Sequence, residues 1–163
     1  MKIDTFSGLH NFKIISFLFI LFTLLSCTTD NIKRNPFLYE ISFNHSINLN
    51  LPEYDNLNFA GGSMFVDYGG INGLLIFNLN GNDIFAWEAS CSNHSLETCS
   101  KLEIEGLLAN CGCDGLKYSL ATGQLLDSLS PEQLIEGDIT SSSQYPLLNY
   151  KAQKSGKIII ISN

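Results

Sequence analysis

The strongest constraint on this chain is a group of four cysteines confined to one short segment. They are Cys91, Cys99, Cys111 and Cys113. The spacings C-x₇-C and C-x-C match structural zinc sites poorly, because those sites usually present C-x₂₋₄-C pairs. Four cysteines allow three disulfide pairings, and spacing alone does not choose among them. The segment therefore predicts a region in which two stretches of chain are held together.

Residues 1–26 have the pattern of an export signal. Lys2 lies near the start of the chain, and Lys13 directly precedes an apolar run at 14–25. A run of this length is typical of the hydrophobic part of a signal peptide, and it is shorter than the roughly 20 residues that a membrane-spanning helix needs. We therefore expect this segment to be separate from the fold.

The end of the apolar run, Leu24-Leu25-Ser26-Cys27, resembles the lipobox of bacterial lipoproteins. The resemblance implies a lipoprotein signal peptide at 1–26, acylation of Cys27 and a lipidated tether at 27–36. Acyl chains such as palmitate contribute about 0.8 kcal/mol per buried CH₂, so several chains hold a protein at a membrane without a spanning helix. We expect a lipid-anchored protein of the bacterial cell envelope, facing the periplasm or the exterior. The alternatives are a soluble secreted protein and an uncleaved anchor.

Charge and motif content exclude other classes. The chain has 9 Lys+Arg against 16 Asp+Glu, a net charge of −7, and its basic residues after position 26 are scattered. Nucleic-acid binding needs clustered Lys and Arg, so that function is excluded. The sequence contains no G-x-S-x-G, H-E-x-x-H, P-loop or G-x-G-x-x-G motif. We expect no catalytic residues, and at most an electron-transfer component rather than an enzyme.

Residues 37–163 predict a β domain, because Gly, Asn, Asp and Pro interrupt the chain every several residues and no long helical pattern of apolar residues occurs. Single strands are expected at 37–43 and 63–67. A hairpin is expected from 73–79 and 84–89 around an Asn-Gly turn. Two further hairpins are expected within 102–109 and 145–161, and a short helical turn at Ser130.

The cysteine segment also resembles a known family. Cys91-Ser92-Asn93-His94 and Cys111-Gly112-Cys113-Asp114-Gly115 resemble the two loops of Rieske [2Fe–2S] domains, each of which supplies one Cys and one His. Gly61-Gly62, the hairpin at 73–89 and Tyr145-Pro146-Leu147 make the chain most similar to small Rieske-like lipoproteins of bacterial envelopes. The resemblance implies an all-β fold, a Rieske-like antiparallel β-sandwich of small sheets with two cysteine-bearing hairpin loops.

Carried over residue by residue, the resemblance implies a degenerate cluster site made of Cys91, His94, Cys111 and Asp114. His94 follows Cys91 as C-x-x-H where the family has C-x-H, and Asp114 stands where the second His is expected. Two imidazoles on one iron raise the potential of the Rieske site, whereas a carboxylate adds negative charge. The only other histidine after the signal, His45, is expected at the surface.

The same resemblance implies disulfides. In Rieske proteins with an extra cysteine on each loop, those two cysteines pair, and Cys99 and Cys113 occupy comparable places. Without iron, Cys91 and Cys111 face each other across the same gap, which implies a second bridge. Closing that loop of about 21 residues is worth roughly 3 kcal/mol in the chain-entropy model.

The resemblance leaves two functions open. The first is a Rieske-like envelope lipoprotein without a cofactor, cross-linked by disulfides, with a binding or structural role toward another envelope protein. The second is a [2Fe–2S] electron carrier that serves a membrane-associated redox partner.

Overall fold

The computed structural model describes residues 34–126 and 144–163. The predicted signal, Cys27 with most of the tether and the helical turn expected at Ser130 lie outside these residues, so they stay predictions. Contacts divide the chain into Met1–Arg34 and Asn35–Asn163, and the fold below is that of the second unit. Within the two described ranges, no helix is long and apolar enough to cross a bilayer.

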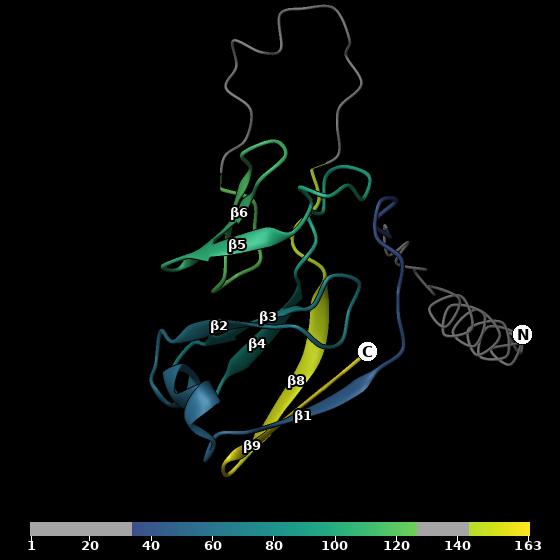
Figure 1. Ribbon diagram of the computed structural model, residues 1–163. Helices are drawn as coiled ribbons and strands as arrows, with labels where there is room; N and C mark the ends of the chain where they lie inside the picture. Colours follow the sequence, from purple (N-terminus) through teal and green to yellow (C-terminus); the bar gives the residue numbers. More distant parts are fainter. Residues whose placement is uncertain (1–33, 127–143) are drawn as a thin grey trace, which may run out of the picture. The chain divides into compact units, whose positions relative to one another are not determined.

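Six strands form the larger of two antiparallel sheets, in the order β1-β9-β8-β4-β3-β2 (Figure 1). Their bounds are β1 Asn44–Asn48, β2 Ser63–Val66, β3 Leu74–Asn78, β4 Ile84–Glu88, β8 Asn149–Ser155 and β9 Ile158–Ser162. A 3₁₀ helix, η1 (Pro52–Asn58), lies between β1 and β2 in the sequence and contacts β2 and β3.

The smaller sheet has the order β5-β6-β7, with β5 at Leu102–Glu105, β6 at Leu108–Cys111 and β7 at Lys117–Ser119. All of its pairs are antiparallel. Residues of β5 contact β2, and Lys101 places its ammonium over the Phe65 ring of β2, 3.7 Å from the centroid. The all-β fold with two sheets is confirmed.

The hydrophobic interior consists of two cores on opposite faces of the β3–β4 hairpin. The first core contains Leu74 and Ile76 of β3, and the second contains Leu75 and Phe77. Successive side chains of a strand point to opposite faces, so β3 is covered on both sides and all five of its residues are buried. The remaining first-core residues are Ile47, Leu49, Leu57, Val66, Ile84, Ala86, Tyr150, Ile159 and Ile161. The remaining second-core residues are Trp87, Ala89, Cys91, Leu102, Ala109, Cys111, Tyr118, Leu120 and Leu147.

The predicted hairpins are present. In the first, Asn78 of β3 pairs with Ile84 of β4, and Gly81 in the turn has a φ of 94°. This left-handed backbone favours glycine, and the Gly81 amide donates to the Asn78 side chain at 2.6 Å. In the second hairpin, β5 and β6 flank Gly106 and Leu107, and Glu105 pairs with Leu108. The strand predicted at 63–67 is β2, one residue shorter.

The strand predicted at 37–43 is wrong. That segment is irregular, and the strand begins afterwards, at Asn44. Without strand pairing, Leu38 is still buried, and the partly buried Phe43 packs edge-on against Tyr150 with centroids 4.8 Å apart. β1 has only one buried residue, Ile47, and its position follows from pairing with β9.

Two further differences concern strand limits. The third hairpin is present, but its first strand starts at Asn149 rather than near Tyr145. β7, a strand that the sequence pattern did not predict, pairs with β6 over three residues. It brings the buried Tyr118 into the second core.

Candidate disulfide and metal-ligand site

The first cysteine loop, residues 89–101, connects β4 to β5 and is closed at its base by backbone hydrogen bonds. The Cys91 amide donates to Ser100 O at 2.8 Å, and the Leu102 amide donates to Ala89 O at 2.7 Å. Ser90 and Lys101 add a β-bridge at the same place. The loop therefore leaves and re-enters the fold beside one point, with Cys91 in the second core.

The second cysteine loop, residues 112–116, connects β6 to β7. Cys111 is the last residue of β6, so it lies in a strand and not in the loop to which the resemblance assigns the cysteines. The loop is a tight turn, because the Gly115 amide donates to Cys111 O at 3.0 Å and the Cys111 amide donates to Leu116 O at 2.9 Å. Gly115 has a φ of 72°, which only glycine adopts readily.

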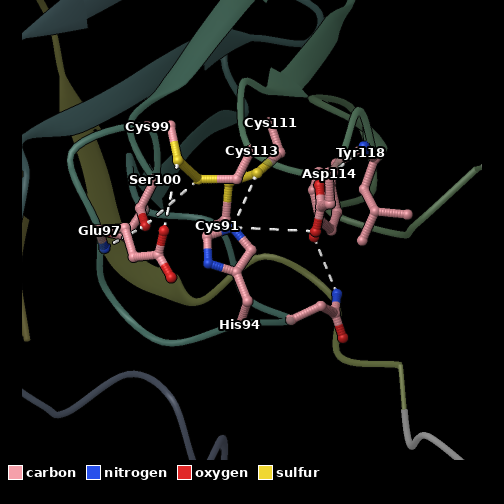
Figure 2. Close-up of a disulfide and its surroundings, with 12 residues drawn as sticks. Cys91, His94, Glu97, Cys99, Ser100, Cys111, Cys113, Asp114 and Tyr118 are labelled. Carbon is pink, nitrogen blue, oxygen red and sulfur yellow. Dashed lines mark hydrogen bonds and ion pairs between the residues drawn. A yellow bond between two sulfur atoms is a disulfide. The ribbon is translucent and has the colours of Figure 1, made fainter.

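Two disulfides join the cysteine loops, in the pairing that the Rieske resemblance implied (Figure 2). Cys91 and Cys111 form the inner disulfide, with Cα atoms 5.8 Å apart. Cys99 and Cys113 form the outer disulfide, with Cα atoms 5.1 Å apart. Cys91 and Cys111 are buried within the second core, whereas Cys113 is exposed. The inner disulfide is thus a packing element as well as a cross-link.

The four cluster-ligand candidates lie together around the inner disulfide. One donor atom from each of Cys91, His94, Cys111 and Asp114 lies within 4.8 Å of all the others. His94 Nε2 is 3.1 Å from Cys111 Sγ and 3.9 Å from Asp114 Oδ2 (Figure 2). The side chains of His94 and Asp114 are 21% and 31% exposed, so they lie between the disulfide and solvent.

Hydrogen bonds to the backbone orient both of these polar side chains. His94 Nδ1 is 2.7 Å from Ser95 O. A carbonyl oxygen only accepts, so Nδ1 donates this hydrogen bond, and Nε2 is the ring nitrogen that faces Cys111. Asp114 Oδ1 accepts from the Leu116 amide at 3.0 Å, which leaves Oδ2 toward His94.

This arrangement does not fit the [2Fe–2S] cluster that the resemblance implies. The sulfurs of Cys91 and Cys111 are bonded to each other, so neither is a thiolate. In a Rieske site, two irons and two bridging sulfides separate the Cys pair from the other ligand pair. Donor atoms that all lie within 4.8 Å of one another leave no room for that core.

Asn93 is a site residue that sequence reasoning did not single out. Its side-chain amide donates to Tyr118 Oη and to Tyr145 O, both at 2.9 Å, and its oxygen accepts from the Tyr145 amide at 2.7 Å. Asn93 thereby ties the first cysteine loop to β7 and to the segment before β8. Its partners are 25 and 52 residues away, so no local sequence signal identifies this role.

Tyr118 completes the underside of the site. It is fully buried, and this burial raises the pKa of its phenol; the hydrogen bond from Asn93 acts in the opposite direction. The phenol therefore stays neutral and serves as a fixed hydrogen-bonding group beneath the loops.

Glu88 is a second residue whose role sequence reasoning did not identify. Its carboxylate is fully buried and accepts from Ile71 N at 2.6 Å, Asn72 N at 3.0 Å and Tyr150 Oη at 2.7 Å. Burial, followed by the hydrogen bond and charge of Glu88, raises the pKa of Tyr150. Glu88 is the last residue of β4 and directly precedes the first cysteine loop. Its hydrogen bonds to Ile71 and Asn72 therefore hold the β2–β3 loop at this position.

His45 lies away from this cluster, on β1. It is half-buried rather than a surface residue, because its ring packs on Tyr68 with centroids 4.5 Å apart. Among the described residues its Nε2 has no hydrogen-bond partner, and burial lowers the pKa of the imidazole.

The solved structures to which this chain is similar include ferredoxins. A chain from a structure titled as the complex of reduced oxygenase and oxidized ferredoxin in carbazole 1,9a-dioxygenase has TM-score 0.41 and 17% identity, covering 63% of this chain and 82% of that one. The Sphingomonas yanoikuyae B1 ferredoxin has TM-score 0.40 and 16% identity, covering 64% and 88%. The carbazole 1,9a-dioxygenase ferredoxin of Nocardioides aromaticivorans IC177 has TM-score 0.41 and 14% identity, covering 75% and 97%.

No protein-family model matches the sequence, and no curated protein matches it. The layout itself is Rieske-like: a small sheet carries two facing cysteine loops, and a disulfide joins the loops. With TM-scores of 0.40 to 0.41 and identities of 14% to 17%, these similarities assign no ligand or partner to this chain.

Proposed function

We propose that this chain is an envelope lipoprotein whose Rieske-like loops are cross-linked by disulfides in place of a cluster, and that it has a binding or structural role toward another envelope protein. The inner disulfide carries the proposal. It joins the two sulfurs that a cluster would require, and both cysteines are buried in the second core.

The two disulfides also support export. Disulfides persist in oxidising compartments such as the bacterial periplasm and are rare in the cytosol. The signal-like segment at 1–26 and the lipobox resemblance at Cys27 agree with such a compartment. The lipid anchor, the tether at 27–36 and the membrane location are part of the proposal.

The anchor is tested by fractionation of cells that express the full chain. The parent chain is expected in the membrane fraction and to take up a labelled palmitate analogue. A Cys27→Ser variant is expected to lose the label, and a Thr28→Ser variant, the matched control, to keep it. Labelling of the Cys27→Ser variant equal to that of the parent would contradict lipidation at Cys27.

The absence of a cluster is tested on the full chain purified without oxygen. We expect no visible absorption, no iron and no acid-labile sulfide. The alternative function, a [2Fe–2S] electron carrier with a redox partner, predicts a brown protein with an EPR signal on reduction. That result would replace the first proposal.

A further inference from the structure

The inner site has the geometry of a single-ion site closed by a disulfide. We propose that, once the Cys91–Cys111 disulfide is reduced, Cys91, His94, Cys111 and Asp114 bind one divalent metal ion of the zinc class. The proposal goes beyond the binding or structural role above and does not depend on the lipid anchor.

The distances favour one ion over a two-iron cluster. A tetrahedral ion with bonds of about 2.0–2.3 Å holds neighbouring donors roughly 3.3–3.8 Å apart. His94 Nε2 lies 3.1 Å from Cys111 Sγ and 3.9 Å from Asp114 Oδ2, on either side of that range. All four donor atoms lie within 4.8 Å of one another. Once the Cys91–Cys111 disulfide is reduced, its two sulfur atoms are free to separate to the same donor–donor spacing.

The supporting hydrogen bonds are those of a metal site. A metal-bound His usually donates its second N–H to a carbonyl or carboxylate, which fixes the ring and its tautomer. His94 makes this bond to Ser95 O, so its Nε2 faces the centre of the four donors. Asp114 has Oδ1 occupied by the Leu116 amide and Oδ2 directed to the same centre.

The donor set also indicates the class of ion. Two thiolates, one imidazole and one carboxylate in a compact group suit zinc, which binds all three ligand types in tetrahedral sites. Calcium and magnesium prefer oxygen ligands, so a set with two sulfurs excludes them. Four protein donors fill the coordination sphere, which is the pattern of a structural rather than a catalytic zinc site.

The chemistry requires a dithiol or phosphine reductant. A dithiol gives two electrons and two protons, breaks the S–S bond to leave two thiols, and itself becomes a disulfide. A phosphine gives two electrons and takes an oxygen atom from water to become a phosphine oxide, and the same water supplies the two thiol protons. Metal binding then forms two metal–sulfur bonds and releases the two thiol protons. In the reverse direction, a disulfide oxidant takes two electrons from the two metal-bound thiolates and becomes two thiols with two protons from water, so the Cys91–Cys111 bond forms again and the ion leaves. Cys91 and Cys111 therefore either form the disulfide or bind the metal.

The outer disulfide supplies a competing site that the experiment must remove. Glu97, Cys99 and Cys113 also place their donor atoms within 4.8 Å of one another, and reduction frees both of these cysteines. The test therefore uses the full chain in mild detergent with Cys27, Cys99 and Cys113 replaced by Ser, which leaves Cys91 and Cys111 as its cysteines. In the rest of this subsection only, this triple-serine variant is called the parent chain.

The parent chain is reduced with a phosphine without oxygen and titrated with Co²⁺. We expect about one ion per chain, thiolate-to-cobalt charge-transfer bands, tetrahedral d–d bands and displacement of cobalt by Zn²⁺. The oxidised parent chain is expected to show none of these bands. Asp114→Asn and His94→Ala are expected to weaken binding at least tenfold, and Glu97→Gln to leave it unchanged.

Folding is followed by near-ultraviolet circular dichroism, to which the buried Trp87 contributes. If reduction alone removes that signal, addition of Zn²⁺ is expected to restore it, because metal binding and folding are coupled in such sites. Absence of a thiolate-to-cobalt band in the folded reduced chain, or failure of Zn²⁺ to restore the fold, would overturn the proposal. Equal cobalt affinity in Asp114→Asn, His94→Ala and the parent chain would also overturn it, as would assembly of an iron–sulfide cluster.

Discussion

The two cores on either side of the β3–β4 hairpin are stabilised in different ways. The first core consists of aliphatic side chains and Tyr150, packed between strands of the larger sheet and η1. The second core contains the inner disulfide, and the loops above it are tied by Asn93 and the outer disulfide. The smaller sheet has only three short strands, so it buries little apolar surface of its own. The two disulfides therefore supply, at the cysteine loops, stability that apolar burial supplies in the first core.

Truncation of the first core is expected to have the largest effect. Ile76 is fully buried at the centre of β3, and Ile76→Ala is expected to lower the free energy of unfolding by about 2–5 kcal/mol. Urea unfolding measures the loss. If the first core is independent of the disulfides, the loss is the same with and without reductant; a loss that disappears in reductant would contradict the comparison.

Removal of the inner disulfide is expected to have a somewhat smaller effect. The double variant Cys91→Ala, Cys111→Ala is expected to lose about 3 kcal/mol without reductant, because the unfolded chain is no longer constrained. With reductant present, the chain with all its cysteines and the double variant are expected to differ much less in the free energy of unfolding. The matched variant Cys99→Ala, Cys113→Ala removes a disulfide that closes a shorter loop, so it is expected to lose slightly less unfolding free energy. A larger loss of unfolding free energy on removal of the outer disulfide would contradict the larger stabilising role assigned to the inner disulfide.

Truncation of Asn93 is expected to loosen the second core alone. Asn93→Ala leaves the Tyr145 amide without its side-chain acceptor and Tyr118 without its donor, at a cost of about 1–3 kcal/mol. Amide hydrogen exchange is expected to rise in 89–101 and 117–119 and to stay unchanged in β1 and β9. A uniform rise over both sheets would show that the two cores unfold as one unit.

The smallest expected effect is a pH dependence from His45 of β1, whose ring packs on Tyr68. Burial lowers the pKa of this imidazole below its ordinary value of 6.5. The unfolded chain therefore binds more protons just below pH 6.5, and the stability contributed by His45 is present above that pH and is lost as pH falls.

Between about pH 7 and pH 5, we expect the unfolding free energy of the unchanged chain to fall relative to that of the His45→Gln variant. Urea unfolding at several pH values measures this difference, in which other titrating groups cancel. A difference that is constant with pH would contradict the burial of His45.

The comparison also separates what the sequence predicts from what it does not. The β3–β4 hairpin follows from two β-favouring runs around Asn80-Gly81, a signal that is local. The segment 37–43 has the apolar alternation of a strand but no partner strand, whereas β1 has one buried residue and is ordered by β9. Neither segment carries a local sequence signal that shows whether it pairs with a distant strand.

The same division applies to the site. Cys91, His94, Cys111 and Asp114 were identifiable because the family resemblance depends on residue types at short spacing. Glu88 and Asn93 were not, because an Asn or a Glu acquires its role from partners on distant loops, such as Ile71 and Tyr145. The apolar pattern of a sequence predicts which faces are buried, but not which polar side chain satisfies the buried backbone.

Intact mass spectrometry of the full chain, first under native and then under denaturing, non-reducing conditions, tests the central claim most directly. Two disulfides predict a native mass without iron and a denatured mass lower than that of the reduced chain by four hydrogens. A native mass increased by one Fe₂S₂ unit would contradict the account, because Cys91 and Cys111 would then be cluster ligands.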